Sequence, residues 1–117
     1  MLFIEYPKCT TCQKAKKWLD ENGVQYTDRH IKEARPTYAE LEEWYRKSGL
    51  PLKKFFNTSG LLYKSMELKN KLPQMSEEEQ LRLLATDGML VKRPILVDGD
   101  TVLVGFGADA WEQALLK

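Results

Sequence analysis

The sequence predicts an α/β fold in which four strands form one mixed sheet, with an all-helical insertion between strands 2 and 3. Three observations predict it. A strand-helix-strand pattern occupies residues 2–29, two helix-capping sequences lie within residues 36–88, and a hairpin pattern follows Pro94. The chain of 117 residues has the size of one domain, residues 1–117.

The N-terminal pattern predicts a βαβ unit. Residues 2–6 form a short apolar run of strand length, which ends at Pro7. From Thr10 or Thr11 onward the apolar residues recur at helical spacing, and Asn22-Gly23 ends that helix. Residues 24–29 alternate loosely between apolar and polar side chains, which favours a second strand.

The next fifty residues predict helices. Thr37 and Glu40 form a capping box for a helix that ends at Gly49, and Ser76 with Glu79 forms a second one. Between them, residues 53–60 predict a turn-rich connector and residues 61–68 a short helix. Aromatic side chains of this insertion are expected to form its core, a partner-facing patch being the alternative: Trp44, Tyr45, Phe55 and Phe56.

The C-terminal segment predicts a β-hairpin and a last helix. Residues 95–97 and 101–104 are strand-like and flank an Asp98-Gly99 turn. Gly105-Phe106-Gly107 lacks the third glycine of a dinucleotide-binding loop and is expected to let two backbone segments approach closely. The order βαβ, helices, ββα is typical of a thioredoxin-like (glutaredoxin-like) fold, with a core of about residues 1–35 and 89–117 and an insertion of about residues 36–88.

Composition narrows the class of protein. Hydrophobic residues make up 43% and charged residues 30%, and 18 Lys and Arg stand against 17 Asp and Glu. These values are typical of a soluble globular protein and disfavour direct nucleic-acid binding, which usually requires a basic excess. No segment has the length of a membrane span, so a cytoplasmic location is expected.

The chemistry is expected at the C-x-x-C of Cys9 and Cys12, the two cysteines of the chain. A strand-to-helix junction lowers the pKa of a thiol, because free N–H groups and the positive end of the helix dipole point at it. Cys9 lies at that junction, and Lys8 adds modest positive potential. Cys12 lies one turn further into the helix. We therefore expect Cys9 to be the attacking thiol and Cys12 the resolving thiol.

Two other interpretations of the cysteine pair remain open. Two cysteines at this spacing occur by accident, or as half of a zinc site. Zinc requires about four ligands, and outside the pair the chain offers His30, which more often has a purely structural or solvated role. We expect no metal and no bound cofactor.

Four stretches carry a resemblance to a known family: PKCTTCQKAKKWL, FFNTSGLLYK, LVKRPILVDGD and VLVGF. With these motifs, the chain resembles the arsenate reductase/Spx (ArsC-like) family of thioredoxin-fold proteins over essentially its whole length. The resemblance implies a cis peptide bond before Pro94, beside the cysteine loop with Thr10 and Thr11, and an Arg93 side chain that points at the Cys9 sulfur. A guanidinium is suited to hold a thiolate or an oxyanion.

The chain departs from the sequence patterns of two branches of this family. Glutaredoxin-linked arsenate reductases have a single catalytic cysteine, matched by Cys9, and three arginines that hold the oxyanion. Arg93 matches one of them, while Phe55 and Gly105 stand at the other two. This loss of charge disfavours arsenate reduction. Spx regulators match both cysteines but carry a C-terminal extension beyond the point at which this chain ends, so a less characterised C-x-x-C branch is expected.

The sequence thus favours a thiol-disulfide redox protein with Cys9, Cys12 and Arg93 as catalytic residues. Its expected reductant is a thioredoxin or glutaredoxin system, the latter with glutathione. One alternative is an Spx-like redox-sensing regulator that binds the RNA polymerase α subunit. A second alternative is an arsenate reductase coupled to glutaredoxin or thioredoxin.

Overall fold

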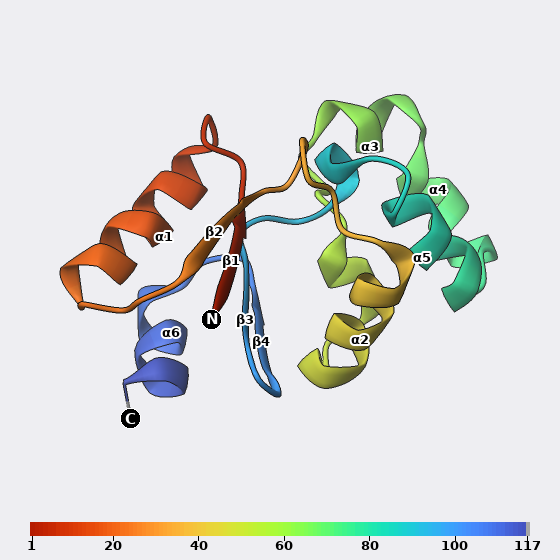
Figure 1. Ribbon diagram of the computed structural model, residues 1–117. Coiled ribbons are helices and arrows are strands. Elements are labelled where there is room, and N and C mark those ends of the chain that lie inside the picture. The colour runs from red at the N-terminus through yellow and green to blue at the C-terminus, as the bar shows by residue number, and fades with distance from the viewer. Residues whose placement is uncertain (117) are drawn as a thin grey trace.

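A four-stranded sheet forms the centre of the protein in the computed structural model, which describes residues 1–116 (Figure 1). The strands are β1 (Leu2–Glu5), β2 (Thr27–His30), β3 (Ile95–Asp98) and β4 (Thr101–Val104), in the order β2-β1-β3-β4. β1 runs parallel to β2 and antiparallel to β3, and β3 is antiparallel to β4. The predicted α/β fold with a mixed sheet is therefore confirmed, and its topology is thioredoxin-like.

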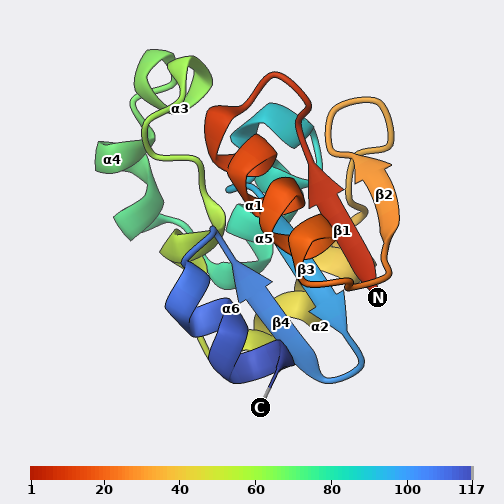
Figure 2. The same ribbon diagram turned by 90° about the vertical axis from the view of Figure 1, so that its left-hand side faces the viewer.

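Two helices cover one face of the sheet and the insertion covers the other, as Figure 1 shows. On the first face lie α1 (Thr10–Glu21) and α6 (Ala108–Leu115). On the other side lies the insertion with α2 (Tyr38–Ser48), α3 (Leu61–Ser65), α4 (Leu68–Lys71) and α5 (Glu77–Leu84), of which α3 and α4 lie farther from the strands (Figure 2). Short 3-10 turns follow α2 at Leu52–Phe55 and α4 at Leu72–Gln74. A third, at Gly88–Leu90, leads from α5 toward β3.

Strand alternation divides the core between these two faces. Phe3 and Leu96 pack with Ala15 and Leu19 of α1 and Trp111 of α6. Ile4 and Ile95 point the other way, into the larger core of the insertion. The predicted insertion core is confirmed: Trp44, Phe55 and Phe56 are buried, and Tyr45 packs against them partly exposed.

The predicted capping boxes of α2 and α5 are both present. Thr37 accepts the backbone N–H of Glu40, and Ser76 accepts that of Glu79, while each glutamate accepts the N–H of its cap residue. Gly49 ends α2 in the left-handed conformation, with φ of 69°. Local hydrogen bonding thus fixes these helix ends independently of packing.

Several boundaries differ from the prediction, and β1 ends at Glu5 rather than at residue 6. β2 begins at Thr27 rather than residue 24, because Val24 donates its N–H to the Leu19 carbonyl in the turn that ends α1. The predicted helix over residues 61–68 is broken at Glu67, whose φ is 54°. The hairpin turn consists of Gly99 and Asp100, because Asp98 pairs with Thr101 inside the ladder.

The Gly105-Phe106-Gly107 segment does permit a close backbone approach. Gly105 has a φ of 77° and donates its N–H to the Pro94 carbonyl at 2.8 Å. This bond fixes the end of β4 beside the start of β3. Within residues 1–116, no helix combines the length and the apolar character needed to cross a membrane.

Candidate functional site

The cysteine loop joins β1 to α1. The Cys9 N–H donates to the Tyr6 carbonyl at 2.9 Å, and the Cys9 carbonyl accepts the Gln13 N–H at 3.0 Å. Cys9 is the N-cap residue of α1, and its side chain makes no capping hydrogen bond. Its sulfur therefore lies where free helical N–H groups are concentrated, as the sequence predicts.

The two cysteines differ in exposure. Cys9 is partly exposed, whereas Cys12 is fully buried in the layer between α1 and the sheet, and both are free thiols. Thr11 lies at the rim of the site, while Thr10 is an exposed first residue of α1 that does not line the cavity beside Cys9.

The loop before β3 brings Arg93 to the cysteine loop. The Arg93–Pro94 peptide bond is cis, as the family resemblance implies. The Arg93 guanidinium lies over the Tyr6 ring, 5.2 Å from its centroid. Its Nε and Nη1 atoms are buried and have no hydrogen-bond partner within residues 1–116. A buried charged fork without an acceptor is suited to an anion or a thiolate.

The environment shifts the pKa values of the two thiols in opposite directions. Burial opposes ionisation of Cys9, but the backbone N–H and thiol of Cys12, together with Arg93, outweigh it and lower the pKa of Cys9. Burial raises the pKa of Cys12 to about 12, and the neighbouring Cys9 adds to this rise despite the Tyr6 N–H. Cys9 is thus the thiol that ionises more readily.

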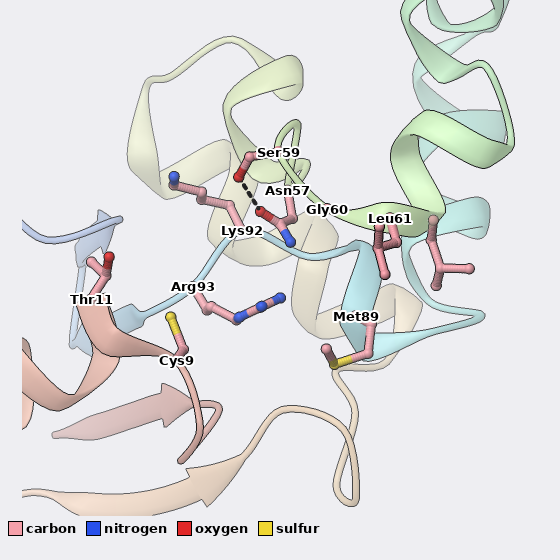
Figure 3. Close-up of a pocket in the computed structure, with 10 residues that line it drawn as sticks. Cys9, Thr11, Asn57, Ser59, Gly60, Leu61, Met89, Lys92 and Arg93 are labelled. Atoms are coloured by element: carbon pink, nitrogen blue, oxygen red, sulfur yellow. Dashed lines mark hydrogen bonds between the residues drawn. The ribbon is translucent and has the colours of Figure 1, made fainter.

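A cavity of about 550 Å³ opens beside the Cys9 sulfur (Figure 3). Cys9 and Arg93 form one wall, and Asn57 and Ser59 lie across the cavity from them. The Ser59 hydroxyl donates to the Asn57 Oδ1 at 3.4 Å. An apolar side of the cavity is formed by Leu61, Leu62 and Met89, of which Leu61 is 87% exposed.

Backbone pairing positions the far wall of the cavity. Asn57 donates its N–H to the Leu90 carbonyl at 2.8 Å, and Lys92 donates its N–H to the Phe55 carbonyl at 2.8 Å. These bonds place residues 55–57 alongside residues 90–92. The sequence did not single out Asn57, Ser59 and Lys92 as site residues, although the stretches FFNTSGLLYK and LVKRPILVDGD, which contain them, carried part of the family resemblance.

The two positions at which the resemblance to arsenate reductases implies arginine carry no charge here. Phe55 is fully buried, and its ring packs edge-on against Tyr45 with centroids 6.1 Å apart. A Cβ on Gly105 would lie 3.4 Å from Lys92 Cε. Lys92 therefore occupies space next to Gly105, and it lines the Cys9 cavity as a second cation.

His30 has a local structural role. Its Nδ1 accepts the N–H groups of Lys32 and Glu33 at 3.2 and 3.1 Å, and its ring packs edge-on against Tyr6. Among the described residues, no three His, Cys, Asp or Glu side chains are grouped so that they could hold a metal ion.

Comparison with known proteins gives consistent matches. The sequence model of the ArsC family matches residues 4–114. The uncharacterised protein YusI of Bacillus subtilis is 57% identical over 113 residues, which cover 97% of this chain and 96% of YusI. The global transcriptional regulator Spx 1 of Bacillus cereus is 29% identical over 103 residues, which cover 88% of this chain and 77% of that regulator. The crystal structure of an ArsC-family-related protein of Bacteroides fragilis is similar with a TM-score of 0.94 and 59% identity, covering 96% of this chain and 94% of that one.

Proposed function

The chain belongs to the ArsC family, and from that premise we propose that it is a thiol-disulfide oxidoreductase in which Cys9 attacks and Cys12 resolves. The observation that carries the proposal is the placement of the two thiols, with Cys9 partly exposed at the N-terminus of α1 and Cys12 fully buried one turn further along the same helix. The opposite pKa shifts of the two thiols support it. A partly exposed thiol with a lowered pKa lies beside a buried thiol whose pKa is about 12. The first can attack an incoming disulfide while the second stays protonated.

In the first step, the Cys9 thiolate attacks one sulfur of the substrate disulfide. A new bond forms between Cys9 and that sulfur, the substrate S–S bond breaks, and the other substrate sulfur leaves as a thiolate. The Arg93 guanidinium lies beside Cys9 and has two buried nitrogen atoms without an acceptor. It stabilises the thiolate before attack, and its charge favours the departing thiolate.

In the second step, Cys12 resolves the mixed disulfide. Burial is the main cause of the raised pKa of Cys12, and the neighbouring Cys9 raises it further. Once Cys9 is in a disulfide, its negative charge is gone, so this second contribution disappears and Cys12 loses its proton more readily. The substrate thiolate released in the first step accepts the Cys12 proton. Cys12 then attacks the Cys9 sulfur, the bond between Cys9 and the substrate sulfur breaks, the Cys9–Cys12 disulfide forms, and the second substrate sulfur leaves as a thiolate.

The electron balance requires an external reductant. The substrate disulfide gains two electrons, which the two cysteines lose as they form their own disulfide. A dithiol of the thioredoxin type, or glutathione with a glutaredoxin, returns the two electrons by the same exchange chemistry. No bound cofactor takes part in this sequence.

The proposal is tested by the products of mild oxidation. With peroxide, Cys9 is oxidised to a sulfenic acid and Cys12 displaces water from it, so intact mass should fall by about two mass units. A covalent dimer as the main product, or a stable glutathione adduct when glutathione is added with the peroxide, would overturn the resolving role of Cys12. The Cys12→Ser variant should instead accumulate mixed disulfides with substrate proteins, and Cys9→Ser should trap none.

A regulatory function is the second candidate, favoured by the likeness to a transcriptional regulator and by the exposed Leu61 beside the Cys9 cavity. Formation of the Cys9–Cys12 disulfide would then alter a contact with the RNA polymerase α subunit. Pull-down with the C-terminal domain of that subunit, using oxidised and reduced protein, distinguishes the two candidates. Binding that depends on the disulfide supports the regulator.

A further inference from the structure

We propose that the free edge of β4 binds an extended segment of the substrate protein as an added strand, and so presents the substrate's cysteine to Cys9. This inference rests on the proposed thiol-disulfide function and names its substrate class as a polypeptide. Three observations carry it: unpaired backbone groups on β4, a groove beside them that reaches the Cys9 cavity, and the composition of the edge.

The backbone of β4 has hydrogen-bonding groups that β3 does not use. Hydrogen-bonded and non-hydrogen-bonded pairs alternate along an antiparallel ladder. The Gly105 N–H bond to Pro94 fixes this alternation, so Leu96 with Leu103 and Asp98 with Thr101 are the hydrogen-bonded pairs. The N–H and C=O groups of Val102 and Val104 therefore point away from β3. β4 is the last strand of the sheet, and within residues 1–116 these groups have no hydrogen-bond partner.

A groove of about 650 Å³ runs along this edge. Ser48 and Leu50, at the end of α2, line it on the insertion side of the sheet, and Ala110 and Trp111 of α6 line it on the other. Figure 2 shows β4 facing the viewer at the edge of the sheet, with α6 beside it. The groove therefore has the walls and the backbone groups that an added strand requires.

The groove leads to the candidate active site. Thr11 and Lys92 line both the β4 groove and the Cys9 cavity, so the two hollows meet at these residues. β4 ends at Val104, and the following Gly105 is bonded to Pro94, which directly follows Arg93. A segment paired with β4 thus passes toward Cys9 with its main chain already in an extended conformation.

The composition of the two sheet edges differs in the expected way. Edge strands that must not pair usually carry charges or proline. β2, the opposite edge, reads Thr-Asp-Arg-His, whereas β4 reads Thr-Val-Leu-Val. The charged β2 edge is protected against strand addition, and the apolar β4 edge is open to it.

The lining of the groove defines the chemistry of the segment. Lys92 is its one charged side chain among the described residues, and the rest are apolar or small and polar. Apolar and β-branched side chains suit the walls, and an acidic residue near the substrate cysteine suits Lys92 and Arg93.

The test tethers a strand-forming peptide to Cys9 and measures protection of β4. A bromoacetyl peptide of about ten alternating valine and threonine residues, with glutamate next to the bromoacetyl group, alkylates Cys9 in the Cys12→Ser chain. The reference is the same chain capped with iodoacetamide. Amide hydrogen exchange of Val102 and Val104 should slow at least about tenfold in the tethered protein, while Leu103, already bonded to Leu96, should not change.

Peptide variants provide the matched control. N-methylation at every second residue blocks the N–H groups on one edge of the peptide, and shifting the methylated set by one residue blocks those on the other edge. One set should abolish the protection and the other should preserve it. Equal exchange in tethered and capped protein, or equal effects of the two methylated sets, would overturn the inference.

Protection already present in the capped protein and dependent on its concentration would assign the edge to a second copy of this chain, and would also overturn the inference. Alkylation forms a thioether and needs no thiol-disulfide exchange. Failure of strand addition is therefore distinguishable from failure of the proposed function, which the peroxide experiment decides separately.

Discussion

The Arg93 guanidinium lies 5.2 Å from the centroid of the Tyr6 ring, and the Tyr6 carbonyl accepts the Cys9 N–H at 2.9 Å. One residue therefore links the positive charge to the cysteine loop: the Tyr6 ring positions Arg93, and the Tyr6 backbone fixes Cys9. The ring face attracts the cation without occupying its N–H donors, so Nε and Nη1 remain available to an anion.

Replacing Arg93 with methionine should reduce the reactivity of Cys9. The variant keeps most of the side-chain stem and removes the charge, so packing is retained while the thiolate loses a partner. Alkylation of Cys9 at neutral pH, measured in the Cys12→Ser background, should slow by about 3- to 10-fold. The pH profile of alkylation should move toward higher pH.

Arg82→Met is the matched control for this prediction. The Arg82 guanidinium also lies 5.2 Å from the centroid of a tyrosine ring, that of Tyr38 on α2, but it does not line the Cys9 cavity. Its loss should leave the alkylation profile unchanged. Superimposable profiles for Arg93→Met and the parent would show that Arg93 does not act on the thiolate.

Arsenate reduction should remain near background with either glutaredoxin or thioredoxin as reductant. Phe55 is fully buried in the core, and Gly105 has no side chain, so neither supplies the charge that three arginines give a reductase. Arsenate turnover is measured with each reductant in excess. Saturable turnover that disappears in Cys9→Ser would mean that Lys92 and Arg93 suffice to hold the oxyanion.

Local signals in the sequence predicted most of the fold. The capping boxes at Thr37 and Ser76 each satisfy backbone N–H groups within four residues, so their helix starts needed no tertiary information. Cys9 was predicted at the start of α1 from another local signal, the change to helical spacing of apolar residues after Pro7. β2 was misplaced because its register depends on pairing with β1, and residues 24–26 alternate as plausibly as Thr27–His30.

The far wall of the candidate site could not be predicted in this way. Asn57 reaches the Cys9 cavity because residues 55–57 pair with residues 90–92, a contact between segments far apart in the chain. In the sequence Lys92 was visible only as a neighbour of Arg93, and its place beside Gly105 follows from the packing of two loops. Such contacts follow from tertiary packing, on which a single sequence carries little local information.

Gly88→Ala should destabilise the protein by about 3 kcal/mol or more, because the added carbon cannot be accommodated. Gly88 is buried, and a Cβ there would overlap the Ile31 carbonyl oxygen and lie 2.7 Å from the Ile31 carbonyl carbon. Denaturant unfolding measures the loss. Gly107→Ala is the control, since its Cβ would meet only Ala110 Cβ at 3.9 Å, and equal stability of the two variants would contradict the prediction.

A buried acid lies beneath α1. Glu5 is 2% exposed, and its Oε2 has no hydrogen-bond partner within residues 1–116, although Lys16 Nζ lies 3.6 Å away. Burial raises the pKa of Glu5 from an ordinary value of 4.5 to about 7, and Asp28 adds to the rise while Lys16 opposes it. This carboxyl therefore titrates in the neutral range when the protein is folded.

The free energy of unfolding should consequently fall as pH rises from about 5 to 8, by on the order of 1–3 kcal/mol from this group. Below pH 4.5, the pKa of Glu5 in the unfolded chain, both states hold the proton. Between pH 4.5 and about 7 the folded state keeps a proton that the unfolded state has released, so each increase in pH favours unfolding.

Glu5→Gln should flatten this part of the profile and stabilise the protein at the alkaline end. Denaturant unfolding across the range measures it, with Glu33→Gln, an exposed carboxylate after β2, as the control. If Glu5→Gln and Glu33→Gln give the same slope as the parent, the buried carboxyl is already ionised at neutral pH, and its salt bridge to Lys16 outweighs the cost of burial.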